Sequence, residues 1–291
     1  MEIALDPLAP ARRGRWSGHG VRVRRRTGPH RAHALSDTVC TPRFCTHRDG
    51  DILTVEHDLT PAELSDELAV QLAEQLVDSG LLRGQPEFEL VFTGVVRSTV
   101  DGAAPAWLQF YRNSLARLEG GTTAFAPVHE RAASLIRGGH VLDLGSCFGF
   151  FPLRLKLLGI DVTATDLSEP TMALLELTSA ALRRPLRTLC CDAADVPRPD
   201  HCVDTVTALH LVEHLPDGTI DAVLREALRL ARHRVVIAVP FEDEPRACYG
   251  HVQRFDLTRL RVLGERLCDE HSGLRATVHE FHGGWLILDK S

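Results

Sequence analysis

A short segment of this 291-residue chain places an acid at the end of a strand-like run and a glycine turn directly after it. His140–Leu144 reads as a strand around Asp143, and Gly145, Cys147 and Gly149 follow at alternate positions. Such turns are typical of cofactor sites, because glycine lets the backbone approach a ligand closely. The pattern argues against binding of a dinucleotide cofactor through its pyrophosphate. The G-x-G-x-x-G motif is met at one position of three, and Asp143 would direct a negative charge toward the phosphates.

S-adenosylmethionine has no phosphate, and its sulfonium and ammonium groups are complementary to an acid at the first strand's end. Here the chain resembles the class I S-adenosylmethionine-dependent methyltransferases, whose first motif is an acid followed by three glycines at alternate positions. Asp143, Gly145 and Gly149 match this motif, and Cys147 departs from it at the middle glycine. We expect that position 147 does not need a glycine-only backbone angle and that a small side chain fits there.

Two further strand ends carry the same resemblance. Asp166, followed by Leu167, comes 23 residues after Asp143, where this family binds the two ribose hydroxyls. An alternative role for Asp166 is to cap the next helix. Asp192 and Ala193 resemble the acid and the neighbouring amide that contact adenine. The resemblance covers residues 138–291 and implies S-adenosylmethionine as the cofactor.

The segment 204–217 resembles the family's fourth-strand motif, in which His210 is expected to flank the cofactor. A hydroxyl acceptor would benefit from a base, and a neutral imidazole can accept its proton. His214 resembles a histidine of sugar and small-molecule O-methyltransferases and is the first candidate, with a structural hydrogen bond as the alternative. His251, in a stretch similar to the family's G-H-x-x-x-F segment, is the second candidate. Glu213 could orient His214.

No metal site is predicted. Cys40, Cys45 and His47 have irregular spacing, and no second pair follows them. Glu242 and Asp243 could hold sugar hydroxyls or assist a metal, although surface carboxylates are the commoner explanation. The eight cysteines contain no C-x-x-C pair and are interpreted as reduced thiols of a cytoplasmic protein.

The predicted cofactor and catalytic residues can form one site only if the strands that precede them end at the same edge of a sheet. Strands alternate with helices from His140 onward, which predicts an α/β, doubly wound, mostly parallel seven-stranded sheet with an antiparallel edge strand, the Rossmann-like methyltransferase fold. The predicted strands are 140–144, 161–165, 187–191, 205–210, 234–239, 276–281 and 285–288. The predicted helices are 151–158, 169–182, 220–231 and 256–270. Ser168 is expected to cap the second of these helices.

Two regions precede this domain. Residues 1–34 hold eight arginines against two acids and are predicted to be a disordered tail, either dispensable or a polyanion-binding arm. Residues 35–137 form a smaller α+β accessory or acceptor-binding region, with strands at 52–57 and 88–96 and helices near 64–79, 106–118 and 124–136. A capping box with a proline is predicted at Thr60–Glu63. The methyltransferase domain is predicted to span 138–291.

Composition limits the partners. The net charge is −6, and the tail contributes about +6, so the remainder is strongly acidic and no stable nucleic-acid binding is expected. No window is apolar enough to span a membrane. The sequence gives no basis for an oligomeric state.

The function expected from the resemblance is methyl transfer from S-adenosylmethionine to a hydroxyl of a small molecule or glycan. The N-terminal region, Cys147 and the GHVQRFD stretch look similar to methyltransferases associated with mycofactocin, which implies a glucose hydroxyl of its oligosaccharide as the acceptor. The alternatives are an N- or C-methyltransferase of a quinone-like or amine metabolite, and a regulatory protein that binds the cofactor without catalysis.

Overall fold

The computed structural model describes residues 5–26 and 37–291, and the chain divides into two compact units, Met1–Arg117 and Leu118–Ser291. The predicted boundary at 137/138 therefore differs from this division by about one helix. Helix α4 (Phe125–Ser134) belongs to the second unit. Its residues Val128 and Ala132 pack in the same hydrophobic cluster as strands of that unit's sheet, which explains the assignment.

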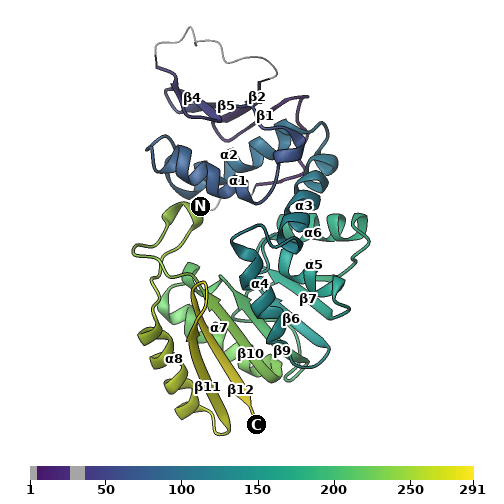
Figure 1. Ribbon diagram of the computed structural model, residues 1–291, viewed down its shortest axis with the longest axis vertical. Coiled ribbons are helices and arrows are strands. Elements are labelled where there is room, and N and C mark those ends of the chain that lie inside the picture. Colours follow the sequence, from purple (N-terminus) through teal and green to yellow (C-terminus); the bar gives the residue numbers. More distant parts are fainter. Residues whose placement is uncertain (1–4, 27–36) are drawn as a thin grey trace. The chain divides into compact units, whose positions relative to one another are not determined.

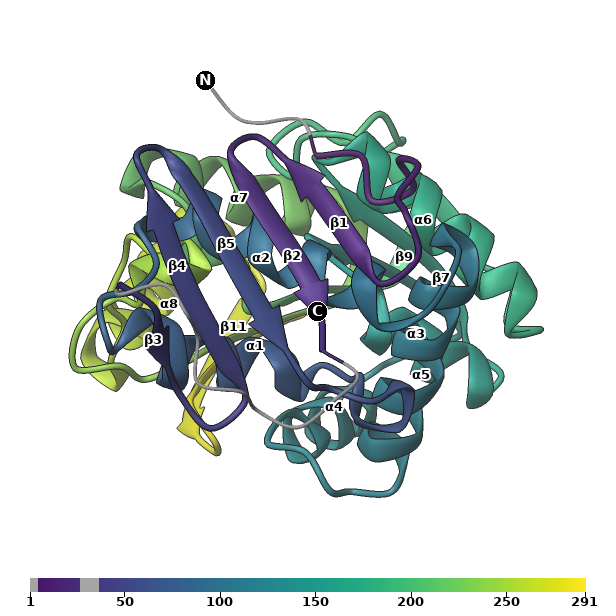
Figure 2. The same ribbon diagram turned by 90° about the horizontal axis from the view of Figure 1, so that it is seen from above.

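The first unit contains a five-stranded sheet in the order β1-β2-β5-β4-β3, in which β2 and β5 are parallel and the other pairs antiparallel. Figure 2 shows these strands lying over α1 and α2. The strands are β1 (Arg15–Gly18), β2 (Val21–Arg25), β3 (Val39–Cys40), β4 (Phe44–Asp49) and β5 (Ile52–His57). The prediction of β5 is confirmed.

The expectation of a disordered tail over 1–34 is wrong for its described part, which contains β1 and β2. Val21 and Val23 alternate with Arg22 and Arg24, so the valines are buried and the arginines exposed, as the two-residue period of a strand requires. The segment before β1 is also fixed, because the carbonyl of Pro7 accepts hydrogen bonds from the side chains of Arg97 and Trp107. The rest of the predicted tail, 1–4 and 27–34, lies outside the described residues.

The helices of the first unit follow β5, and the predicted capping box at their start is confirmed. Glu63 accepts hydrogen bonds from the backbone amide and the hydroxyl of Thr60. A hydrogen bond from Arg43 is the main cause that lowers the pKa of Glu63 to about 2, and the two bonds from Thr60 act in the same direction. The elements are η1 (Pro61–Glu63), α1 (Glu67–Leu72), the π-helical η2 (Ala73–Val77), α2 (Gly84–Thr99) and α3 (Ala103–Glu119).

The strand predicted at 88–96 is wrong, because these residues lie inside α2. Every residue from Leu90 to Thr99 is buried, so the run shows no polar face that would reveal a helical period. Gly94 allows α2 to approach the sheet. A Cβ atom at this position would collide with Val23 and Trp16.

The cysteine prediction also needs correction in this unit. Cys40 and Cys45 face each other in the β3–β4 pair and form a disulfide, so they are not the reduced thiols expected from the sequence. Within the described residues, no helix combines the length and the apolar character that a membrane span needs.

The second unit contains the predicted seven-stranded sheet, in the order β11-β12-β10-β9-β6-β7-β8 (Figure 1). Strands β6 to β10 are parallel neighbours, and β12 runs antiparallel between β10 and β11. The strands are β6 (His140–Leu144), β7 (Asp161–Asp166), β8 (Arg187–Cys190), β9 (Val203–Leu209), β10 (Ala231–Val239), β11 (Leu274–Glu280) and β12 (Gly284–Lys290). The prediction of a doubly wound α/β sheet with an antiparallel strand at this side is confirmed.

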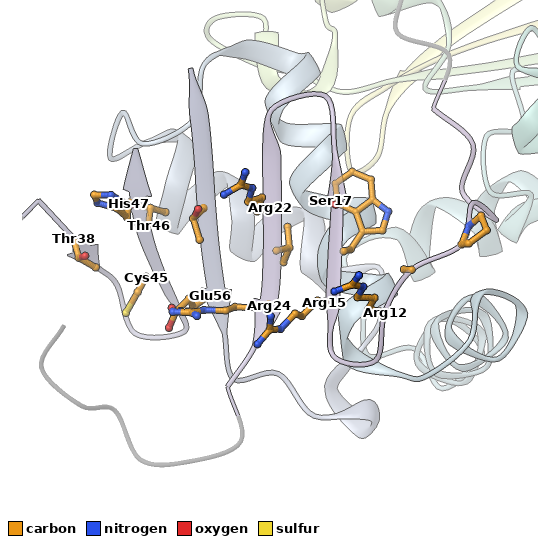
Figure 3. Close-up of a pocket in the computed structure, with 15 residues that line it drawn as sticks. Arg12, Arg15, Ser17, Arg22, Arg24, Thr38, Cys45, Thr46, His47 and Glu56 are labelled. Atoms are coloured by element: carbon orange, nitrogen blue, oxygen red, sulfur yellow. Dashed lines mark hydrogen bonds and ion pairs between the residues drawn. The ribbon is translucent and has the colours of Figure 1, made fainter. Parts of the chain in front are cut away.

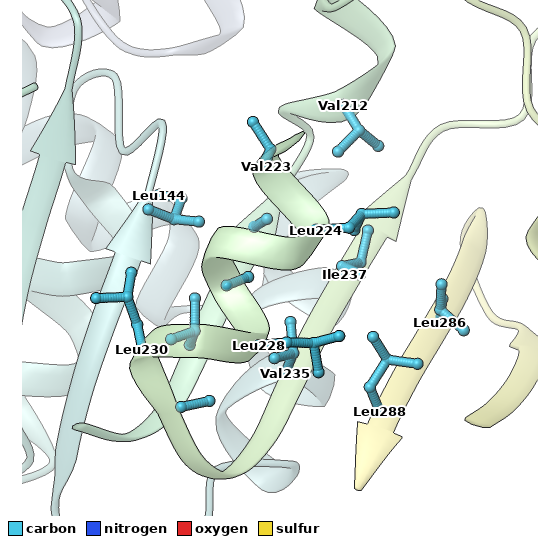
Figure 4. Packing of buried hydrophobic residues seen from close by; sticks show 14 of the residues in the cluster. Leu144, Val212, Val223, Leu224, Leu228, Leu230, Val235, Ile237, Leu286 and Leu288 are labelled. Carbon is cyan, nitrogen blue, oxygen red and sulfur yellow. The ribbon is translucent and has the colours of Figure 1, made fainter. Parts of the chain in front are cut away.

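Helices connect these strands and cover the sheet. They are α5 (Phe150–Leu157), α6 (Glu169–Ala181), η3 (Val212–His214), α7 (Asp217–Leu230), η4 (Ala247–Tyr249) and α8 (Leu257–Glu270). Figure 4 shows Leu224 and Leu228 of α7 beside Ile237 and Val235 of β10. Burial of this aliphatic layer fixes the strand ends at one edge of the sheet, where the predicted site residues lie.

Candidate active site

Asp143 lies near the end of β6 and is almost fully buried, with 3% of its surface exposed. Its two carboxylate oxygens accept hydrogen bonds from the hydroxyls of Ser146, at 2.7 Å, and Thr207. Burial is the main cause that raises the pKa of Asp143 to about 6, and the nearby charge of Asp166 adds to it, while the two hydroxyls act in the opposite direction. The carboxylate therefore also supports the turn that follows β6.

The turn after β6 uses left-handed backbone angles at three positions. The φ values are 64° at Gly145, 48° at Cys147 and 68° at Gly149. The expectation that position 147 needs no glycine-like angle is therefore wrong: Cys147 adopts such an angle with a side chain in place. The side chain is tolerated in space because Cys147 is exposed, whereas a Cβ at Gly145 or Gly149 would collide with Leu211 or Leu175.

Asp166 ends β7 and lies close to this turn. One carboxylate oxygen accepts the backbone amide of Cys147 at 2.9 Å, and the other accepts that of Ser168 at 3.0 Å. The cap of α6 is Ser168, which accepts the amide of Thr171, so the structure favours the turn and not the helix as the partner of Asp166. Leu167 is 68% exposed beside it.

Asp192 and Ala193 follow β8 at the same edge of the sheet. Asp192 is exposed, and its carboxylate accepts the backbone amide of Ala194 at 2.8 Å. The backbone amide of Cys191 donates to the carbonyl of Asp166 at 3.0 Å, which ties the ends of β7 and β8 together. The acids predicted for ribose and adenine thus occupy adjacent strand ends. Their contacts with a cofactor remain predictions.

Leu211 joins this turn to the catalytic candidates. Its side chain occupies the space that a Cβ of Gly145 would need, and η3 begins at the next residue. The preceding His210 has φ of 54° and donates its backbone amide to the carbonyl of Ala238. Its ring packs edge-on against Phe125 of α4, an aromatic neighbour that the sequence did not suggest.

Glu213 is 1% exposed, although it carries a carboxylate. Neither carboxylate oxygen makes a hydrogen bond within the described residues, and the nearest cationic candidate is Nδ1 of His210, 3.3 Å from Oε1. The predicted orientation of His214 by Glu213 is therefore not supported by a hydrogen bond. The backbone carbonyl of Glu213 accepts the amides of Val252 and Gln253.

The two histidine candidates lie against each other, with ring centroids 4.7 Å apart and edge-to-face geometry. Burial lowers the pKa of His214, and the charge of Glu213 acts in the opposite direction. His251 places Nδ1 2.8 Å from a carboxylate oxygen of Glu242. Because a carboxylate only accepts hydrogen bonds, Nδ1 carries the proton in the neutral tautomer of this ring, and the lone pair is then on Nε2. The sequence analysis predicted a surface carboxylate, or a ligand for sugar hydroxyls or a metal, and did not predict that Glu242 would be the partner of His251.

The first unit has a separate hollow with a volume of about 810 Å³, shown in Figure 3. Its lining includes Arg12, Arg15, Arg22 and Arg24, and Glu56 forms an ion pair with Arg24. None of the predicted site residues lines this hollow.

Residues 142–239 match the family model described as a methyltransferase domain. The match begins just before Asp143 and extends through His214 to the end of β10, but it does not reach His251. It supports an S-adenosylmethionine-dependent methyltransferase, with S-adenosylmethionine as the cofactor. A search of curated proteins gave no match.

Solved structures with a similar fold share little sequence with this chain. A protein from Pyrococcus horikoshii OT3 is 13% identical with a TM-score of 0.48, covering 57% of this chain and 88% of its own. Magnesium protoporphyrin IX methyltransferase from Synechocystis, with bound S-adenosylmethionine, is 18% identical with a TM-score of 0.43, covering 64% and 84%. A methyltransferase from Aquifex aeolicus is 18% identical with a TM-score of 0.44, covering 60% and 97%.

Proposed function

We propose that this protein transfers the methyl group of S-adenosylmethionine to a hydroxyl oxygen of a small molecule or glycan. The observation that carries the proposal is the link between the cofactor turn and the histidine pair. Leu211 packs over Gly145, and Glu213 and His214 follow within three residues. His251 lies against His214. A hydroxyl held by these rings would lie next to the cofactor's expected position.

The reaction is an in-line displacement. The hydroxyl oxygen forms a bond to the methyl carbon, the carbon–sulfur bond breaks, and its electron pair returns to sulfur. The products are a methyl ether and S-adenosylhomocysteine, and the hydroxyl proton must leave. Much of the catalysis is positioning, and ionisation of the hydroxyl supplies the rest.

The cluster of Glu213, His214 and His251 is our candidate for the group that activates the hydroxyl. In a metal-free cluster, His251 is the better placed base, because Glu242 fixes its tautomer and would stabilise the imidazolium formed on proton transfer. Burial favours neutral His214, so it too can accept a hydrogen bond at neutral pH.

For the acceptor, our finer proposal is a glucose hydroxyl of the mycofactocin oligosaccharide. Its support is the sequence resemblance of the N-terminal region, Cys147 and the GHVQRFD stretch. The polar character of the cluster agrees with a hydroxylated acceptor, since unpaired polar groups are costly beside an apolar one.

The test uses the full chain with methyl-labelled S-adenosylmethionine and separate pools of glucosides, quinols and amines. Mass spectrometry should find the label as a methyl ether on a glucoside. His251→Ala should lower turnover by about 100-fold without changing the Kd for the cofactor, as expected for loss of a base. His233→Ala, an exposed histidine on β10, is the matched control and should keep full turnover.

A labelled methyl group on an amine nitrogen or a carbon of the product would refute O-methylation and support the alternative, an N- or C-methyltransferase. Cofactor binding without any labelled product would favour a regulatory protein. If His214→Ala and His251→Ala both keep full turnover, the histidine pair does not activate the acceptor.

A further inference from the structure

The buried carboxylate of Glu213 is the least satisfied charged group in the described site. It has 1% of its surface exposed, and both of its oxygens lack a hydrogen-bond donor. Burial of an ionised carboxylate without a partner is costly, and in proteins such groups are paired with a cation or coordinate a metal. A positive charge near these oxygens would offset this cost. Protonated His210, with Nδ1 3.3 Å from Oε1, is one candidate, and a bound cation is the other.

Two nitrogen ligands lie within reach of this carboxylate. One donor atom from each of Glu213, His214 and His251 can be chosen so that all three lie within 4.8 Å of one another. An ion with bonds of about 2.1 Å would hold its ligands at most about 4.2 Å apart. Small rotations of the three side chains would therefore be sufficient to close around it.

Each of the two imidazoles already makes one hydrogen bond within the protein. His251 uses Nδ1 for its hydrogen bond to Glu242, and the His214 ring makes a hydrogen bond to the backbone of Gly250. Histidines that bind metals nearly always donate their second nitrogen to a carboxylate or a backbone carbonyl, which fixes the tautomer and the ring orientation. The arrangement presents one free lone pair from each ring.

We infer that Glu213, His214 and His251 bind one divalent transition-metal ion, with Glu242 as the residue that positions His251. Two imidazoles and one carboxylate suit Zn²⁺, Fe²⁺ or Mn²⁺, whereas Mg²⁺ and Ca²⁺ prefer oxygen ligands. His214 and His251 are not fully buried, and three protein ligands leave coordination positions that can take water or an acceptor oxygen.

The consequence for catalysis rests on the proposed function. An imidazole that ligates the ion through its lone pair cannot also accept a proton there. The bound ion would instead ionise the acceptor hydroxyl as a Lewis acid, and the proton would pass to solvent water. The carbon–oxygen and carbon–sulfur bonds then change as in the transfer described above.

Ion binding is tested without any acceptor. The full chain is stripped with a chelator, dialysed, and titrated with Co²⁺ and Zn²⁺ by absorption spectroscopy and calorimetry. We expect one ion per chain with nitrogen–oxygen ligation in the visible Co²⁺ spectrum. Glu213→Gln, close in shape to the original, and His251→Ala should each weaken the affinity by at least about 100-fold, and Glu242→Gln by about 10-fold. The control His233→Ala should bind as the unaltered protein does.

Equal ion binding by the unaltered protein and Glu213→Gln would overturn the inference and leave His210 as the cationic partner of Glu213. Methyl transfer at full rate in excess chelator would also overturn the catalytic consequence while leaving O-methylation intact. Stoichiometric binding without transfer to any hydroxyl would do the reverse: the ion site would stand, and the proposed function would fail.

Discussion

Asp143→Asn tests the buried acid that the first motif places beneath the turn. Asparagine has the same shape, and its amide can donate to Ser146, whose hydroxyl also donates to the backbone carbonyl of residue 143. The single side-chain oxygen of asparagine remains available to accept the hydroxyl of Thr207. The substitution therefore removes the charge and keeps the hydrogen bonds.

The magnitude follows from the raised pKa of Asp143, about 6 in the folded protein against an ordinary value of 3.8. A raised pKa means that the folded state binds the proton more tightly, so this stabilisation is present at low pH and is lost as pH rises through 6. Keeping Asp143 in the folded protein then costs about 3 kcal/mol at pH 8, where it is ionised, and about half as much at pH 5, where it is mostly protonated. The neutral asparagine of the variant avoids this cost, so its advantage in unfolding free energy should grow by about 1–2 kcal/mol between these pH values.

The assay is calorimetric melting of the cofactor-free protein at pH 5 and pH 8. For a unit of this size, the difference in Tm between variant and unaltered protein should widen by about 3–6 °C. Asp269→Asn, which neutralises an exposed acid on α8, should show no such widening. A Tm difference that is the same at both pH values would refute the reasoning, because Asp143 would then not titrate between them.

Three further outcomes follow from the turn and the first unit. Asp143→Ala should largely abolish cofactor binding measured by calorimetry, and a Kd within threefold of the original would contradict a role in the site. Cys147→Gly should keep the Kd for the cofactor within a few-fold, and a large loss of affinity would give the thiol a role. The variant should not lower Tm, because the left-handed strain of about 1 kcal/mol that it removes is similar to the entropy cost of the added glycine. Gly94→Ala should lower the unfolding free energy of the first unit by about 1–3 kcal/mol in urea titrations, since its Cβ would overlap Val23 and Trp16. Gly218→Ala, which meets open space, is its control.

The second unit was predictable because its strands are short apolar runs separated by helices of ordinary length. Prediction and structure agree within two or three residues at most ends, for example at β6 and at the start of α6. The first unit was less predictable because its sequence patterns are hidden in two places. In α2 the apolar run is buried on all sides and hides its helical period. In β2 the arginines dominate the composition and hide the alternation with Val21 and Val23.

At the site, residue type was easier to predict than residue geometry. The acids at the ends of β6, β7 and β8 were found from their order along the chain. The angle at Cys147 was not, because a cysteine in the left-handed region contradicts the usual preference and only the backbone reveals it. The partnership of Glu242 with His251 was also hidden, since nothing in their spacing requires contact across the loop that holds η4.

Glu213 is the residue of the site whose surroundings differ most from those expected from the sequence. The sequence analysis gave it a supporting role, the orientation of His214, although adjacent side chains seldom face each other. In the structure its carboxylate is buried beside His210 and shares a small volume with His214 and His251. A helix-capping or surface role would leave the carboxylate solvated or bonded to amides, and neither is observed within the described residues. This buried carboxylate, which has no hydrogen bond of its own, is therefore the feature on which the proposed ion site rests.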